Sequence, residues 1–454
     1  MKDENILYWV WLAEKCGVAS RHFRHLVDKY DDPFDIYRLE EDEIDHIEGI
    51  DTNLKNALGD KSLENSYSII RYCKSNKVDI ISYGDKRYPG RLRDIEDPPV
   101  CLYCLGKFPQ MDSSLCIGIV GTRKMSEYGK QTAYKISYEL AGADCIIISG
   151  MALGIDGVAA CGALSAEGRT VAVLGSGISV IYPKEHKKLM KEITKKGAVI
   201  TEYPPFERPN PWNFPKRNRI ISGLCQGVLV VEGNARSGAL ITASKAIAQG
   251  RAIFALPGKV NESNSDGPNE LIRQGATIAL SSADILGEFE FLYGDVINTQ
   301  GYLRAKDHSD LDERALKKMS VYSSTIDGHY FVGSDSTNNT SEAPKKEKNS
   351  ANNEEEKNKK VIKERESVAK NNTESNTENK EENNKLTEEK IKSILEGLDS
   401  TSRIVYNVLP RDRSFTAELP VSHGIDISDV VTALTFLEIN GLISSLPGGA
   451  YKVN

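Results

Sequence analysis

Short runs of apolar residues punctuate the middle of the chain, and glycine-rich or polar residues follow each of them directly. The runs lack the alternation of polar and apolar positions that marks a half-exposed strand, so we expect strands buried on both faces. Helical stretches separate them. The pattern predicts an α/β fold with a doubly wound parallel sheet, whose strands include 117–120, 146–148, 171–174, 198–200, 228–231 and 252–256.

The two ends of the chain have other patterns. About the first 75 residues read as helical, and 47–50 reads as a helical hairpin turn. Because Glu48 and Asp51 flank Gly49, we expect this turn to pack or to contact protein and not to grip phosphates. From about residue 391, helical periodicity gives way to two apolar runs around the turn 447–449, which predicts a winged-helix-like module ending in a β-hairpin.

A low-complexity segment separates the module from the rest. Residues 341–390 repeat Asn, Glu, Lys and Ser, and no aromatic residue occurs between Phe331 and Tyr406. Such a segment buries too little apolar surface to offset chain entropy, so we predict a disordered linker. The predicted domains are a helical domain of SAM or helix-hairpin-helix type, the sheet domain, a connecting segment, the linker and the module: 1–75, 76–290, 291–340, 341–390 and 391–454.

Charge narrows the possible partners. The 454 residues include 58 Lys and Arg against 65 Asp and Glu, a formal net charge of −7, which excludes a uniformly basic nucleic-acid binder. Any nucleic-acid site must therefore be a local basic patch. No apolar stretch reaches the roughly 18 residues of a membrane span, and the apolar start at 6–13 lacks a cleavage site. With eight scattered cysteines, we expect a reduced, cytoplasmic protein.

The loops after the strands are the candidate ligand site. In an open parallel sheet these loops gather at the carboxyl ends of the strands, where ligands bind. Glycines allow backbone amides to approach an anion, and helix N-termini favour negative charge. The sequence therefore predicts a phosphate-binding rim formed by the loops 121–129, 149–156, 175–183, 202–205 and 237–242.

The segment 208–219 has the most distinctive composition, with four basic residues, no acid and two aromatic residues. Basic residues interleaved with aromatic ones are typical of a groove for an unpaired nucleic-acid strand. The alternative is that its arginines form internal ion pairs and its aromatic residues belong to the core. In that case Arg217 and Arg219 would pair with Glu202 or Glu232, and Trp212 and Phe214 would be buried.

Signs of catalysis or of a metal site are weak. The P-loop, zinc-protease and serine-hydrolase motifs are absent, and Val180 stands where a dinucleotide fingerprint needs its third glycine. Asp156 reads as a charge partner of a helix N-terminus, and His186 as a surface residue. Cys101 and Cys104 read as strand residues and not as half of a zinc site. We therefore expect no catalytic residues, no metal and no cofactor.

Taken together, the loops and the basic segment resemble the DNA-processing protein A family of bacteria (DprA, also called Smf). The matching motifs follow the family's order over roughly residues 80 to 290. They are 121–123, 128–129, 149–156, 175–177, 182–183, 214–224, 237–243, 250–251, 255–258, 267–272 and 275–276.

This resemblance implies an extended Rossmann-like fold that binds single-stranded DNA without hydrolysing nucleotides. It also implies a homodimer that covers incoming strands in natural transformation and loads the RecA recombinase onto them. Carried over by position, the residues expected to contact DNA are Gly121, Arg123, Ser149, Gly150, Gly154, Lys184, Phe214, Lys216, Arg217, Asn218, Arg219 and Ser237.

Two other functions fit the same pattern. One is an enzyme or sensor that acts on a small nucleotide at the strand ends, with Glu202 or Glu232 as its carboxylate. The other is a scaffold that recruits partners through its tethered module. Residues 396–454 carry four Lys and Arg against seven Asp and Glu, so we expect this module to contact protein or tune the core and not to bind duplex DNA tightly.

Overall fold

The computed structural model divides the chain into two units, Met1–Asp335 and Ser336–Asn454, which are described separately. The described residues are 3–310 and 319 in the first unit, and 400–411, 414–416, 419, 430, 433–434, 437–438, 442–446 and 450–453 in the second. The predicted linker 341–390 lies outside them, as does most of the predicted connecting segment after residue 310.

Six helices precede the sheet, which confirms the all-helical prediction for this region. Asp51 accepts a hydrogen bond from the backbone N–H of Leu54, so the carboxylate beside the predicted hairpin turn caps a helix. Gly49 in that turn has a φ of +79°, a conformation that favours glycine. The helices are α1 (Asp3–Cys16), α2 (His22–Lys29), α3 (Pro33–Arg38), α4 (Glu41–Asp45), α5 (Thr52–Gly59) and α6 (Glu64–Ser75).

A nine-stranded sheet forms the centre of the first unit, in the order β1-β2-β6-β5-β4-β3-β7-β8-β9. The strands from β3 to β9 pair in parallel, whereas β2 pairs antiparallel with both β1 and β6. All six predicted strands are present, as β3 to β8. The strands are β1 (Val78–Ser82), β2 (Cys101–Gly106), β3 (Cys116–Val120), β4 (Ile146–Ser149), β5 (Thr170–Val173), β6 (Ala198–Thr201), β7 (Gly227–Val230), β8 (Ala252–Ala255) and β9 (Thr277–Ile278).

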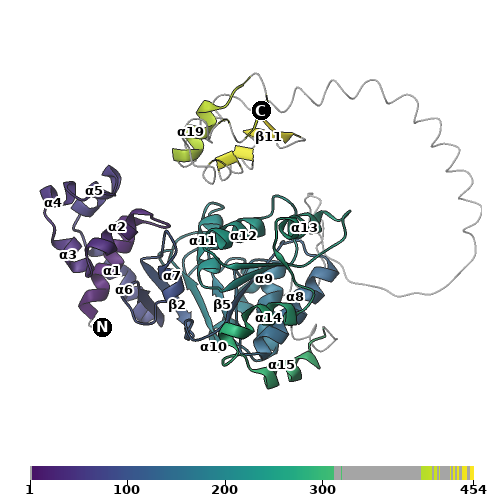
Figure 1. The fold of residues 1–454 in the computed structure, drawn as a ribbon. Coiled ribbons are helices and arrows are strands. Elements are labelled where there is room, and N and C mark those ends of the chain that lie inside the picture. Colours follow the sequence, from purple (N-terminus) through teal and green to yellow (C-terminus); the bar gives the residue numbers. More distant parts are fainter. Residues whose placement is uncertain are drawn as a thin grey trace, which may run out of the picture. The chain divides into compact units, whose positions relative to one another are not determined.

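Helices cover both faces of the sheet (Figure 1). One layer holds α8 (Glu127–Gly142), α9 (Ile155–Ser165), α10 (Lys187–Lys196) and α14 (Ser282–Tyr293). The other holds α7 (Gly90–Arg93), α11 (Asn213–Gly223), α12 (Gly238–Ala248) and α13 (Asp266–Arg273). Successive residues of β3 enter opposite cores, Ile117 and Ile119 on one side and Cys116 and Val120 on the other, as the continuous apolar runs predicted.

The N-terminal helices and the sheet share one hydrophobic core. Trp9 and Trp11 of α1 belong to the same buried cluster as Tyr103 of β2 and Val158 of α9. The helical region is therefore packed onto the sheet and continuous with its core.

The helices that follow the sheet are bound to α8. Glu139 is buried in α8 and accepts hydrogen bonds from the hydroxyls of Ser282 and Ser309. Ser282 lies at the start of α14, and Ser309 follows α15 (Thr299–Lys306). The chain from 282 to 310 therefore packs against the sheet domain.

The second unit contains α19 (Ser400–Val408) and an antiparallel sheet of β10 (Phe415–Thr416), β11 (Ile443–Leu446) and β12 (Ala450–Val453) in the order β10-β12-β11. Strands β11 and β12 pair from Ile443 with Val453 to Leu446 with Ala450, which confirms the predicted hairpin. Within the predicted module, 391–399 and most of 417–441 lie outside the described residues. Within the described ranges, no helix is long and apolar enough to cross a membrane.

Candidate nucleic-acid interface

The sheet changes its winding direction at β3, which has β4 on one side and β7 on the other. Ligands of open α/β sheets bind where the order reverses, at the carboxyl ends of the strands. A cleft of about 330 Å³ lies there, between the loops that follow β3 and β7. We call it the strand-end cleft; its lining includes Gly121, Thr122, Arg123, Asp156, Phe214, Arg217, Asn218, Asn234, Arg236, Ser237 and Gly238.

Backbone hydrogen bonds hold the loops of the strand-end cleft together. The N–H of Thr122 donates to the carbonyl of Glu232 at 2.7 Å, and the N–H of Ile155 donates to the carbonyl of Thr122 at 3.2 Å. Gly154 precedes Ile155 with a φ of +80°, and a Cβ there would lie 2.3 Å from the Thr122 carbonyl oxygen. Glycine is therefore required at position 154 for the loops to meet.

Phe214 forms an aromatic wall between cationic side chains. Its ring centroid lies 5.6 Å from the guanidinium carbon of Arg123 and 5.9 Å from that of Arg217, within cation–π range. The Tyr182 ring is 5.5 Å away. Gly175 makes room for this arrangement, because a Cβ there would lie 2.8 Å from Phe214 Cδ1. The half-buried Phe214 therefore lies between the strand-end cleft and a smaller hollow that Gly175 and Tyr182 line.

Arg217 is buried, and backbone carbonyls solvate its charge. Its guanidinium donates to the carbonyl of Gly150 at 2.9 Å and to the carbonyl of Val173. Burial lowers the pKa of Arg217 to about 10, so the side chain is still protonated at neutral pH. Neither Glu202 nor Glu232 bonds to it, so the pairing that the sequence alternative gave for Arg217 is wrong.

Asp156 is the carboxylate among the residues that line the strand-end cleft. It lies in the first turn of α9, is buried and accepts the Gly150 N–H at 3.1 Å. Burial raises the pKa of Asp156, and the nearby charges of Arg217 and Arg123 oppose that rise. Three arginines therefore face one carboxylate, which leaves a net positive lining, and Asp156 is the helix-terminal charge partner that the sequence predicted.

The helix α11 divides its basic residues among three environments. Phe214, Arg217 and Asn218 share the face that lines the strand-end cleft, as their i, i+3 and i+4 spacing requires. Lys216 is exposed and lines neither the cleft nor the smaller hollow. Arg219 points into the core.

The expectation that Arg219 contacts DNA is therefore wrong for this geometry. Its guanidinium pairs with Glu202 at 2.7 Å and with Asp97 at 3.1 Å, and its side chain is 2% exposed. Glu202 also accepts the N–H of Ala19 at 3.5 Å, so this ion-pair cluster connects the N-terminal region to the sheet domain. The internal pairing that the sequence analysis weighed is correct for Arg219 with Glu202.

Glu232 has a different partner. It accepts the backbone N–H of Ser126 at 2.9 Å and also the Ser126 hydroxyl, where Ser126 is the N-cap residue of α8. The second acid that sequence reasoning offered as an arginine partner therefore helps to organise the start of a helix.

The remaining predicted site residues lie around the rim. Lys184 is exposed in the short helix η1 (Lys184–His186), directly after the Tyr182 and Pro183 that line the smaller hollow. Ser237 is the N-cap of α12 and accepts the Ala239 N–H at 3.3 Å, which leaves its hydroxyl proton for another acceptor. Ser149 is buried at the end of β4, beneath Gly150.

Arg236 is a lining residue that the sequence analysis did not select. It is exposed in the loop between β7 and α12 and faces the same cleft as Arg123 and Arg217. The sequence held a signal for Arg236, because this residue directly precedes Ser237, which was expected to contact DNA.

Two other sequence interpretations can now be judged. His186 is buried and not on the surface; its Nδ1 lies 3.0 Å from the Met151 carbonyl oxygen, and burial lowers its pKa. Cys101 and Cys104 are buried strand residues that enter opposite cores, as predicted. No cluster that could hold a metal ion occurs among the residues that the structure describes.

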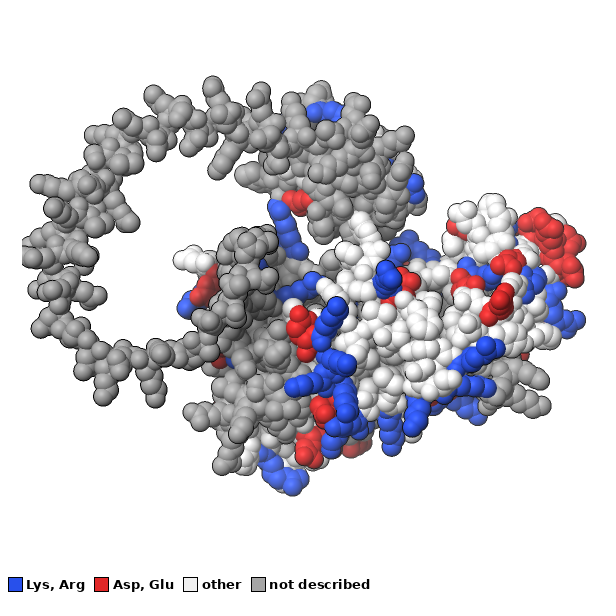
Figure 2. All heavy atoms as spheres, turned by 180° about the vertical axis from the view of Figure 1, so that it is seen from behind, with Lys and Arg blue, Asp and Glu red and all other residues white. Residues whose placement is uncertain are grey.

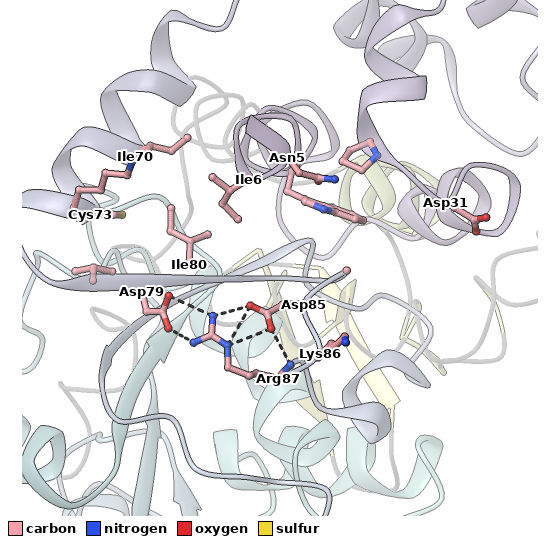
Figure 3. Close-up of a pocket in the computed structure, with 15 residues that line it drawn as sticks. Asn5, Ile6, Asp31, Ile70, Cys73, Asp79, Ile80, Asp85, Lys86 and Arg87 are labelled. Atoms are coloured by element: carbon pink, nitrogen blue, oxygen red, sulfur yellow. Dashed lines mark hydrogen bonds and ion pairs between the residues drawn. The ribbon is translucent and has the colours of Figure 1, made fainter. Parts of the chain in front are cut away.

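A larger hollow of about 760 Å³ lies beside the edge strand β1 and not at the strand ends (Figure 3). Its floor carries Arg87, which bonds to both Asp79 and Asp85. These contacts neutralise the guanidinium, and none of the predicted site residues lines this hollow.

Charge is unevenly distributed over the first unit. Figure 2 shows Asp and Glu gathered at the end formed by the N-terminal helices, with Lys and Arg along the lower edge of the central part. The acidic end includes Glu41, Asp42, Glu43 and Asp45 of α4, all exposed. A group of exposed acids of this chain of net negative charge is thus found on the N-terminal helices, whereas Asp156 is the acid that lines the strand-end cleft.

Comparisons with known proteins identify relatives of this chain. The sequence model of DNA recombination-mediator protein A matches residues 79–290. The DNA processing protein DprA of Bacillus subtilis is 42% identical over 211 residues, which cover 46% of this chain and 71% of that protein. DprA of Streptococcus pneumoniae is 42% identical over 212 residues, which cover 46% of this chain and 73% of that protein.

A solved structure of Streptococcus pneumoniae DprA gives the same result. The crystal structure of DprA from Streptococcus pneumoniae superposes with a TM-score of 0.55 at 35% identity, and the match covers 63% of this chain and 98% of that one. DNA processing protein A from Helicobacter pylori, described as having a unique single-stranded DNA binding mode, is 30% identical with a TM-score of 0.43 and coverage of 47% and 95%. With its parallel sheet, strand-end loops and ordered motifs, this chain belongs to the DNA-processing protein A (DprA/Smf) family of DNA recombination mediators.

Proposed function

We propose that this protein binds single-stranded DNA in the strand-end cleft and acts as a recombination mediator during natural transformation. The observation that carries the proposal is that Arg123, Arg217 and Arg236 line one cleft where the sheet reverses. The first two of these arginines lie against the Phe214 ring. Guanidinium groups bind phosphate oxygens, and an aromatic face accepts an unstacked base. The family's description as a recombination mediator supports the same reading.

The proposal includes no catalysis. The two carboxylates nearest the strand-end cleft, Asp156 and Glu232, already accept backbone hydrogen bonds from Gly150 and Ser126. Each therefore serves the fold. Glu232 also accepts a hydroxyl, but that hydroxyl belongs to Ser126, whose side chain caps α8. The DNA would be held and presented and not cleaved.

The proposed contact set combines residues that line the cleft or the smaller hollow with others around them. Arg123, Arg217 and Arg236 supply positive charge in the lining, Phe214 supplies the aromatic face, and Asn218, Gly121, Gly150 and Ser237 complete it. Lys184 and Lys216 are exposed cations outside the lining, and Gly154 and Ser149 belong to the loop that follows β4 and to its last strand residue. Arg219 is left out, because its guanidinium is buried and paired with Glu202 and Asp97.

The partners in this proposal are a second copy of the chain and the RecA recombinase. A homodimer would hold two clefts on one strand, and delivery of that strand to the recombinase would complete mediation. Analytical ultracentrifugation of the full chain tests the first partner, and a RecA filament-assembly assay on protein-coated single strands tests the second. A monomer at all concentrations, or no acceleration of filament assembly, would contradict the respective claim.

The binding test compares single-stranded and duplex DNA of one length over a range of salt. Single-strand affinity should fall steeply with salt, with a log–log slope of about 0.7 for each neutralised phosphate. Arg123→Ala should weaken binding to all sequences alike and flatten that slope by about 0.7. Arg273→Ala is the matched control, because Arg273 is exposed on α13 and pairs with Glu270. Equal affinity for duplex and single strand, or an unchanged slope in Arg123→Ala, would overturn the proposal.

A small-nucleotide sensor is the second candidate, and the size of the strand-end cleft favours it. A volume of about 330 Å³ falls within the range of small-molecule sites. Isothermal titration with mononucleotides separates the two functions. Tight mononucleotide binding that oligonucleotides do not displace would favour the sensor.

A further inference from the structure

The helix α10 carries a basic surface that the site described above does not use. Together with η1 it spans residues 184–196, which contain six lysines and two glutamates. Its buried side, formed by Leu189, Met190 and Ile193, packs on the sheet. The lysines therefore occupy the outer side of an amphipathic helix whose inner side is fixed.

Four of these lysines form one row. Lys188, Lys191 and Lys195 follow each other in α10 at spacings of three and four residues, so they lie above one another on the helix, with neighbours about 5–6 Å apart at Cβ. Lys184 precedes them in η1. All four are exposed, and Lys187 lies beside the row. We call these five residues the lysine row.

Most of the lysine row keeps its charge uncompensated. Lys195 pairs with Glu192 at 2.7 Å, whereas Lys184, Lys187, Lys188 and Lys191 make no ion pair within the described part of the chain. An ordinary solvent-facing helix mixes charges of both signs, as α13 does with Arg273 and Glu270. A single-sign row on a chain of net charge −7 therefore points to a polyanionic ligand.

The lysine row starts beside the smaller hollow, which shares Arg123 and Phe214 with the strand-end cleft, and leads away from it. After β5 the chain passes Tyr182 and Pro183, which line the smaller hollow beside Arg123, and Lys184 follows at once. The helix α10 then returns to the opposite edge of the sheet, where β6 begins. At 1.5 Å per residue, the row extends roughly 16 Å from Lys184 to Lys195.

We propose that the lysine row is a second segment of the DNA path, which takes the phosphates of a single strand as it leaves the strand-end cleft. This inference rests on the proposed function and extends it. Residues 184–196 contain no aromatic side chain, so this segment has no face on which a base could stack. It would bind phosphates alone, and its contribution would be independent of base sequence and highly sensitive to salt.

The test replaces three lysines of the row in the full-length protein, Lys187→Gln, Lys188→Gln and Lys191→Gln, and leaves Lys184 in place. Binding is measured with oligothymidylates of about 6 and about 20 nucleotides, lengths chosen to fill the cleft alone or the cleft and the row. The triple variant should bind the long strand at least about tenfold more weakly, with the salt slope reduced by about 2. Binding of the short strand should be unchanged.

A matched control removes the same charge elsewhere. The control variant carries Lys29→Gln, Lys77→Gln and Lys86→Gln. All three lysines are exposed: Lys29 ends α2, Lys77 directly precedes β1, and Lys86 follows β1. This variant should bind both strands as the unmodified protein does. Thermal unfolding of all three proteins establishes that each is folded.

The outcomes separate the two proposals. An unchanged affinity for the long strand in the row variant, or an equal loss in the control variant, overturns the lysine row while the strand-end cleft stands. If the row variant loses binding of the short strand as well as the long one, the lysines of the row belong to the cleft. The proposal of a separate segment is then wrong. Failure of the unmodified protein to bind either strand overturns the proposed function itself.

Discussion

At the scale of single residues, two arginines of one helix have different roles. Arg217 and Arg219 are both buried in α11, yet carbonyl groups beside the cleft surround the first and carboxylates in the core surround the second. The basic composition of 208–219 predicted both arrangements equally well. The difference depends on which helix face meets the sheet, and that is set by residues distant in the chain, such as Asp97 and Glu202.

We expect Arg219→Met to destabilise the fold by about 3–5 kcal/mol, because it leaves Glu202 buried without its cation. The measurement is urea unfolding of the variant and the unmodified protein. Lys216→Ala on the same helix is the contrast: it is exposed, so its unfolding free energy should stay within about 0.5 kcal/mol. A loss below about 1 kcal/mol in Arg219→Met would contradict the assignment of a buried ion-pair cluster.

The free energy of unfolding should depend on pH because of His186. Because burial lowers its pKa in the folded state, the unfolded chain binds the proton first as pH falls below about 6.5. The folded protein should therefore lose stability between that pH and the lower pKa of the folded state. His186→Gln should not show this loss, and the comparison is the unfolding free energy of both proteins from pH 7.5 to 5.

The titration of Asp156 and Glu202 does not affect the difference between the two proteins. Burial raises the pKa of both carboxyl groups, but they titrate in the variant as well as in the unmodified protein. Parallel pH curves for the two proteins would show that His186 is not the group responsible.

At the scale of elements, the strands were predictable because burial on both faces leaves a continuous apolar run. Strands β3 to β8 have that property. The outer strands lack it: β1 is an edge strand with Asp79 exposed, and β9 has two residues, both exposed. An edge strand pairs with a single neighbour and exposes its other edge to solvent. Its sequence therefore mixes polar and apolar residues as a loop does.

The loops of the strand-end cleft depend on Gly154. We expect Gly154→Ala to cost about 1–3 kcal/mol and to weaken single-strand binding, because φ is +80° and the new Cβ would meet the Thr122 carbonyl. Gly287→Ala is the control: nothing lies within 4 Å of a Cβ at this helix position, so it should stabilise α14 by about 0.5–1 kcal/mol. Differential scanning calorimetry with a binding assay measures both effects. Equal stability of the two variants would contradict the role of Gly154.

At the scale of the whole molecule, the cations of the proposed site and the acids of the C-terminal module belong to different units. The cations at the strand-end cleft belong to the first unit, whereas residues 396–454 contain more acids than bases. The predicted domain boundaries, the linker and the role of the C-terminal module stay predictions. Their test is to separate the units and measure each.

A chain truncated after Asp335 should bind single-stranded DNA with the salt slope of the full chain, since the strand-end cleft is complete within the first unit. Fluorescence anisotropy with a labelled oligonucleotide gives both slopes. If truncation changes the slope by about 0.7 or more, the C-terminal unit contributes phosphate contacts and its acidic composition has been misread.

The shared core of helices and sheet has a practical consequence for optical experiments. Of the three tryptophans in the chain, Trp9 and Trp11 are buried where α1 joins the cluster that also holds the sheet's own side chains. Their emission should therefore change when the sheet melts, although neither residue is part of a strand. Intrinsic fluorescence can follow denaturation of the whole first unit without an added dye, and two separate transitions would reveal that helices and sheet come apart independently.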